Sequence, residues 1–105
     1  MPAGRFYFMI EVELQIPDCI HRKTIVRIVE QVCMTNGVTC TLKGTLAKYP
    51  GSIHWHLKRG KQKGTLEVTW WEREHRLWFK VAENRTSAWI KDSIPILKDQ
   101  IEKSV

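Results

Sequence analysis

The stretch from 53 to 83, IHWHLKRGKQKGTLEVTWWEREHRLWFKVAE, decides the fold. Apolar and polar residues alternate within 53–58, 65–71 and 76–83, which is typical of strands with one buried face. A loop with two glycines separates the first two segments, and the charged residues 72–75 separate the last two. The sequence therefore predicts three consecutive antiparallel strands joined by hairpins.

The side-chain period of two along a strand also predicts how these segments pair, because a wrong register would mix the two faces. Joining the segments through their turns gives one self-consistent set of partners. The expected pairs are Leu57–Leu66, Trp55–Val68, Ile53–Trp70, Trp71–Arg76, Trp70–Leu77, Val68–Phe79 and Leu66–Val81. All the large aliphatic partners fall on one face, so we expect that face to pack against a core.

The segments on the N-terminal side extend this sheet. A strand is predicted over 38–48, followed by the turn Tyr49-Pro50-Gly51-Ser52, where Pro then Gly is typical of a type II turn. We expect this turn to place Leu46 opposite Trp55. A further strand is predicted over 5–16, where apolar residues occupy every second position: Phe6, Phe8, Ile10, Val12, Leu14 and Ile16.

A helix is predicted over 19–35, because apolar residues recur there at three- and four-residue spacing. Asp18 is a candidate N-cap, since its carboxylate can accept a hydrogen bond from the first helical turn. Asn36-Gly37 supplies the residue pair at which helices commonly end.

A second helix is predicted over the last part of the sequence, where Thr86 or Ser87 can cap it. Its apolar stripe consists of Ile90, Ile94, Leu97 and Ile101. Pro95 lies inside this pattern and lacks the N–H that a helix interior needs. Two alternatives therefore stay open: the helix kinks at Pro95, or it ends near Asp92 and Ser93 caps another helix.

The predicted order is strand, helix, four strands, helix. An α+β domain over residues 1–105, with two layers and both helices on one face of an antiparallel sheet, buries the apolar faces of all these elements. This order resembles helix-grip and TATA-binding-protein-like topologies. The resemblance rests on element order alone, so it implies a fold and no function.

Composition agrees with one globular domain. The chain has 105 residues, of which 43 % are hydrophobic, and it carries 17 Lys and Arg against 11 Asp and Glu, a net charge of +6. No apolar run approaches the ~20 residues of a membrane helix, and no signal-peptide pattern is visible. Three cysteines (Cys19, Cys33 and Cys40) suit buried free thiols better than disulfides. We therefore expect a cytoplasmic protein without a membrane segment.

The polar face of the predicted sheet suggests a binding role. Trp71 and Trp78 project from it, and aromatic rings beside cations suit single-stranded nucleic acid. The residues expected to bind are His54, Lys58, Arg59, Lys61, Lys63, Trp71, Arg76, Trp78 and Lys80. The sequence therefore predicts a small non-enzymatic binding module, with nucleic acid as its partner. The alternative is that the same face forms a homodimer or contacts a partner protein.

The register also predicts three rows across this face. They are Ala47, His54, Thr69 and Trp78; Thr45, His56, Glu67 and Lys80; and Lys43, Lys58, Thr65 and Ala82. His54, His56 and Glu67 are candidate metal ligands, because two histidines and one carboxylate on one face are a known set for zinc or iron. The competing interpretation is a polar ladder in which Glu67 pairs with Lys80. The sequence favours the ladder, and we expect neither a metal nor a cofactor.

No catalytic motif is visible in the sequence, which lacks a P-loop, G-x-G-x-x-G and G-x-S-x-G. An enzyme would therefore need a site built from residues distant in sequence. A large ligand cavity between the sheet and the helices is not expected, because bulky residues such as Trp55 and Trp70 fill that space.

Overall fold

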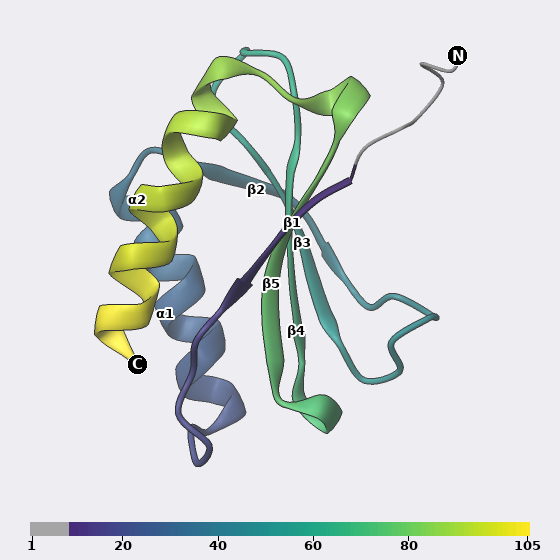
Figure 1. Cartoon of the computed structure of the whole chain (residues 1–105), viewed down its shortest axis with the longest axis vertical. Coiled ribbons are helices and arrows are strands. Elements are labelled where there is room, and N and C mark those ends of the chain that lie inside the picture. The colour runs from purple at the N-terminus through teal and green to yellow at the C-terminus, as the bar shows by residue number, and fades with distance from the viewer. Residues whose placement is uncertain (1–8) are drawn as a thin grey trace.

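The computed structural model describes residues 9–105 and shows one five-stranded antiparallel sheet with the order β1-β5-β4-β3-β2 and two helices on one of its faces (Figure 1). The elements are β1 Met9–Leu14, α1 Arg22–Thr35, β2 Thr39–Gly44, β3 Ile53–Lys58, β4 Leu66–Trp71, β5 Arg76–Ala82 and α2 Ala88–Ser104. Short 3-10 turns at Glu72–Glu74 and Glu83–Arg85 flank β5. The predicted α+β class is confirmed, while the part of the predicted first strand at 5–8 lies outside the described residues.

The register of the three central strands is confirmed. Across β3 and β4 the pairs include Ile53–Trp70, Trp55–Val68, His56–Glu67 and Leu57–Leu66. Across β4 and β5 they run from Trp71–Arg76 to Glu67–Lys80. The structure also shows where the first strand joins the sheet, since β1 is antiparallel to β5.

The core lies between the sheet and the two helices. Trp55, Trp70 and Phe79 are at most 1 % exposed on the inner face of the sheet. They pack in one cluster with apolar residues of α1 and α2. Burying apolar surface in this way is the main favourable contribution to folding, so the alternating pattern of the strands explains the two-layer arrangement. Within the described residues, no helix is long and apolar enough to cross a membrane.

The fifth tryptophan, for which the sequence suggested no role, joins this core. Trp89 is 4 % exposed near the start of α2, and its indole N–H donates a hydrogen bond to the carbonyl of Lys63 at 2.8 Å. This bond ties the second helix to the loop between β3 and β4.

The prediction that Asp18 caps the first helix is wrong. The helix begins later, and His21 is its N-cap, with Nδ1 accepting a hydrogen bond from the backbone N–H of Lys23 at 3.1 Å. The preceding residues are still in a turn, because the N–H of Ile20 bonds to the carbonyl of Pro17. The predicted end is confirmed: Gly37 has φ of +71°, the left-handed conformation that stops a helix.

The second helix is continuous from Ala88 to Ser104 with Pro95 inside it. Ser93 is only 3 % exposed within this helix, so it does not cap a separate one. Leu97 and Ile101, which follow the proline, are completely buried. Their packing against the core compensates for the hydrogen bond that Pro95 cannot donate.

The register predicted for β2 is wrong. Lys43, and not Leu46, lies opposite Trp55, and Gly44 lies opposite His54. This shift of three residues exchanges the two faces of the strand, so the β2 members of the predicted outer rows do not lie there. Leu42 instead pairs with His56 and is 50 % exposed.

The reason for this shift is a longer connection between β2 and β3. The predicted turn is present, since the N–H of Ser52 bonds to the carbonyl of Tyr49 and Gly51 has φ of +81°. A second turn precedes it, in which the N–H of Tyr49 bonds to the carbonyl of Leu46. The buried hydroxyl of Ser52 also accepts a hydrogen bond from the N–H of Leu46 at 3.2 Å. Residues 45–52 therefore form a compact loop, here called the outer-face loop.

The three cysteines are free, as expected, but only Cys33 is buried, whereas Cys19 and Cys40 are exposed. Burial raises the pKa of the Cys33 thiol to about 12, so this thiol stays protonated at neutral pH.

We predict that Gly64→Ala destabilises the fold. Gly64 has φ of +99°, and an added Cβ would lie 2.6 Å from the carbonyl oxygen of Arg85 and 2.8 Å from Cδ1 of Ile90. Strain of this kind costs about 1–3 kcal/mol in the free energy of unfolding, measured by urea denaturation. Gly44→Ala is the control, because no heavy atom lies within 4 Å of that Cβ position. Equal urea midpoints for the two variants would contradict the prediction.

Candidate metal centre on the outer face of the sheet

The outer-face loop lies on the side of the sheet that is remote from the helices (Figure 1). The Tyr49 ring packs at 4.9 Å from the Trp71 ring and 5.1 Å from the Trp78 ring. The indole N–H of Trp71 also donates a hydrogen bond to the carbonyl of Pro50 at 3.1 Å. Trp78 therefore lies on the outer face as predicted, but the loop covers it and it is only 2 % exposed, so its ring is not open to a binding partner.

Arg76, also expected on the binding surface, has partners within the chain. Its guanidinium donates two hydrogen bonds to the carboxylate of Glu13, at 3.0 and 2.8 Å, and lies 4.4 Å from the Trp78 ring. The hydrogen bond with Glu13 is the main reason that the pKa of Arg76 is raised. Arg76 thus joins β1 to β5.

Arg59 contacts the ends of the helices. Its guanidinium donates to the carbonyl of Asn36 at 2.8 Å and lies 5.9 Å from the Trp89 ring. Of the other predicted binding residues, Lys61 and Lys63 are exposed on the loop between β3 and β4, and Lys58 and Lys80 are half-buried. The structure therefore does not bring the nine predicted residues together as one open surface.

It does bring the three candidate metal ligands together. His54 and His56 lie two apart on β3, and Glu67 lies opposite His56 on β4, so the three side chains share the outer face. Nε2 of His54 is 3.1 Å from Nε2 of His56 and 3.3 Å from Oε1 of Glu67. Oε1 of Glu67 is 4.0 Å from Nε2 of His56. One potential ligand atom from each residue therefore lies within 4.8 Å of the other two.

These separations fit a small tetrahedral ion. Zinc bonds to histidine nitrogen and carboxylate oxygen at about 2.0–2.2 Å, which places two ligands of a tetrahedron about 3.4 Å apart. Separations of 3.1, 3.3 and 4.0 Å need only small side-chain movements to reach that geometry.

Thr69 orients one of the two imidazoles. Its hydroxyl lies 2.8 Å from Nδ1 of His54, and both side chains are buried. When Nε2 of His54 binds a metal, Nδ1 carries the proton and donates it to this hydroxyl. Metal-binding histidines usually have such a partner on the other ring nitrogen. The sequence placed Thr69 beside His54, but no sequence signal pointed to its contact with the imidazole.

The electrostatics keep the cluster in a form able to bind a cation. The hydrogen bond from His54 lowers the pKa of Glu67, and burial partly opposes this effect. Burial is the main cause that lowers the pKa of His56, and the Glu67 carboxylate opposes it. At neutral pH, Glu67 is therefore ionised and His56 is neutral, which are the states that metal ligands require.

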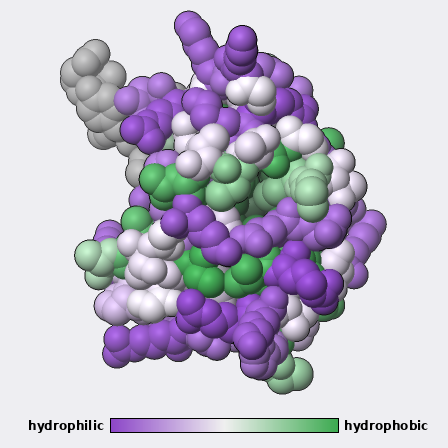
Figure 2. All heavy atoms as spheres, turned by 180° about the vertical axis from the view of Figure 1, so that it is seen from behind, coloured by the Kyte–Doolittle hydropathy of each residue, from purple (hydrophilic) through white to green (hydrophobic). Residues whose placement is uncertain are grey.

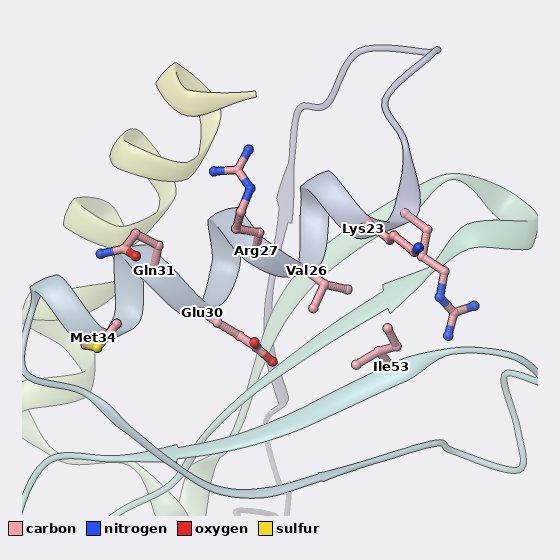
Figure 3. A pocket seen from close by; sticks show the side chains of 8 residues that line it. Lys23, Val26, Arg27, Glu30, Gln31, Met34 and Ile53 are labelled. Carbon is pink, nitrogen blue, oxygen red and sulfur yellow. The ribbon is translucent and has the colours of Figure 1, made fainter.

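Hollows lie along the first helix, and among the described residues no three His, Cys, Asp or Glu side chains converge there as metal ligands would. One has a volume of about 520 Å³ and is lined by residues such as Lys23, Arg27 and Met34 (Figure 3). Its one carboxylate belongs to Glu30, which already accepts hydrogen bonds from Lys43 and the indole of Trp55. On the face seen from behind, hydrophobic residues reach the surface in the middle, with hydrophilic residues around them (Figure 2).

Comparison with known proteins adds no assignment: no protein-family model, no curated protein and no solved structure matches this chain.

We predict that the folded state becomes less stable as the pH falls from 7 to 4. The pKa of His56 is lowered from 6.5 and that of Glu67 from 4.5, so in each case the unfolded chain binds a proton more readily than the folded chain. The free energy of unfolding therefore falls with pH, first through His56 below about 6.5 and then through Glu67 below about 4.5. Urea denaturation across this range measures it. His56→Gln should flatten the upper part of the profile, and an unchanged profile in this variant would contradict the assignment.

Proposed function

We propose that this protein binds a divalent transition metal ion through His54, His56 and Glu67. The observation that carries the proposal is the convergence of two imidazole nitrogens and one carboxylate oxygen at 3.1–4.0 Å from one another. Nitrogen ligands with one carboxylate suit zinc, and they also suit ferrous iron. Zinc is the simplest probe because it has no redox chemistry and accepts this set in tetrahedral geometry.

A set of three protein ligands leaves one tetrahedral position open. Structural zinc sites normally use four protein ligands, whereas sites that bind a water or an exchangeable ligand use three. The side chains of His56 and Glu67 are 27 % and 17 % exposed, while that of His54 is 5 % exposed. The open position therefore faces the solvent side of the cluster.

The competing interpretation is a hydrogen-bonded ladder without a metal. In it, the Nε2–H of His54 is shared between two acceptors, Nε2 of His56 and the carboxylate of Glu67. The ladder explains the same distances, so the two interpretations differ in what the chain does when metal is supplied. A ladder would bind no metal tightly, whereas the proposed site binds one ion per chain.

The test is a zinc titration of the untagged full chain after treatment with a chelator. We expect one zinc per chain. His56→Ala should weaken zinc binding by more than 10–100-fold, which is the loss typical when a residue that only hydrogen-bonds to a metal ligand is replaced. Thr69→Val should weaken it by about 10–100-fold, because the orienting partner of His54 is lost.

His21→Asn is the matched control. It removes a histidine outside the cluster and keeps a residue type that caps helices well. Zinc binding that is absent in the wild-type chain, or that His21→Asn weakens as much as His56→Ala does, would overturn the proposal.

We also propose nucleic acid as a partner, on a different basis from stacking on Trp78. Support comes from the net charge of +6 and from the exposed Lys61 and Lys63 at one end of the sheet. Lysines at such an end can contact phosphates without reading bases. The alternative is self-association through the outer face of the sheet. Light scattering separates a self-associating chain from a monomer that binds nucleic acid.

For the nucleic-acid proposal, anisotropy titrations of labelled single- and double-stranded oligonucleotides should show binding that weakens steeply with salt. For single strands, the double variant Lys61→Ala/Lys63→Ala should reduce the slope of log K against log salt concentration by about 1.4, because two phosphate contacts are lost. Lys91→Ala/Lys103→Ala, with the same charge change on exposed positions of α2, should leave it unchanged. No binding at low salt would exclude this partner.

A further inference from the structure

The candidate metal centre has cationic side chains on two sides. Lys80 on β5 pairs directly with Glu67 across β4 and β5. Lys58 lies two residues after His56 on β3, so its side chain leaves the sheet on the same face. Both lysines are half-buried, which keeps them near the sheet surface.

Arg85 adds a third cation at the same end. The backbone N–H of Thr65 bonds to the carbonyl of Arg85 at 2.9 Å, and Thr65 lies two residues before Glu67 on the same face of the sheet. The Arg85 side chain is exposed. Burial is the main cause that lowers the pKa of His56. The positive charge of Arg85 lowers this pKa further, which agrees with Arg85 lying near His56.

None of these three cations forms an ion pair with a described carboxylate, although Lys80 lies opposite Glu11 on β1 and opposite Glu67 on β4. This holds for residues 10–105 without the side chain of Glu83: no ion pair there involves Lys58, Lys80 or Arg85. A divalent ion would change the charge of the cluster of two imidazoles and Glu67 from about −1 to about +1, beside the three positive charges. Like charges this close repel, so the loaded site is short of negative charge.

We propose that the open coordination position takes an oxygen of a phosphate group, whose other oxygens bind Lys80 and Arg85. The proposal rests on the metal site proposed above. A phosphate offers three oxygens and up to two negative charges, so one oxygen can bind the metal while the others accept hydrogen bonds from cations. Arginine suits this role because its guanidinium donates two parallel hydrogen bonds.

Metal and phosphate should then assist each other. The phosphate neutralises the repulsion between the metal and the surrounding cations, and the metal supplies a bond that the cations cannot. Such coupling is reciprocal: the factor by which phosphate tightens zinc binding equals the factor by which zinc tightens phosphate binding. We expect a factor of at least about five.

The test uses the full chain with and without zinc, titrated by calorimetry with inorganic phosphate and separately with 5′-AMP. Tighter binding of both probes to the zinc-loaded chain supports a phosphate site. Preference for inorganic phosphate would indicate a free anion, and preference for 5′-AMP a phosphate monoester. Zinc is kept at low micromolar concentration, and its affinity is measured by competition with a chelating dye.

Arg85→Gln separates a binding role from a structural one. It should weaken phosphate binding to the zinc-loaded chain by about tenfold or more, since a charged hydrogen-bond donor is lost. In the absence of phosphate, the same variant should bind zinc at least as tightly as the wild type, because one repulsive charge is removed. Arg73→Gln, an exposed arginine in the turn between β4 and β5, makes the same charge change and should alter neither affinity.

The outcomes separate this inference from the proposed function. If zinc binds but does not tighten phosphate binding, the phosphate site is excluded and the metal site stands. If zinc fails to bind with or without phosphate, both proposals are wrong. If phosphate binds equally well with and without zinc, or if Arg85→Gln and Arg73→Gln behave alike, the phosphate site at this position is excluded.

Discussion

The packing of Tyr49 against Trp71 and Trp78 is the interaction on which the outer face of this protein depends. It holds the outer-face loop over a sheet face that would otherwise be open to water. Thr69 and His54, which lie in the covered part, are at most 4 % exposed. Buried polar groups need partners, because an unpaired one loses its hydrogen bonds to water. His54 therefore bonds with Thr69 on one side and with His56 and Glu67 on the other.

The candidate metal centre lies at the boundary between the covered and open parts of that face. His54 is held on the covered side, while His56 and Glu67 are partly exposed. A fully buried site would exclude an external ligand, and a fully exposed one would leave the imidazoles free to rotate. At the boundary the ligands are positioned and the remaining coordination position stays accessible, which is the arrangement an exchangeable ligand requires.

The basic residues of the chain divide into two groups with different surroundings. Arg59 and Arg76 are bound to acceptors within the chain and lie near aromatic rings, so they stabilise contacts between elements. Lys58, Lys80 and Arg85 instead take part in no ion pair among the described side chains, and we propose that they lie around the candidate metal centre. A count of positive charges along the sequence cannot separate these groups, because the difference lies in which acceptors the fold brings near each side chain.

The sequence alone determined the α+β class, the order of elements and the register of β3, β4 and β5. Strict alternation of side chains permits one pairing of those strands that places their large aliphatic residues together on one face. That register placed Glu67 beside His56, so the candidate ligands were visible in the sequence. Only the tertiary structure decided the shift of β2 and the covering of Trp78. Both depend on the outer-face loop. The hydroxyl of Ser52 holds the loop through Leu46, and Tyr49 packs on rings more than 20 positions away. Neither contact leaves a periodic signal in the sequence.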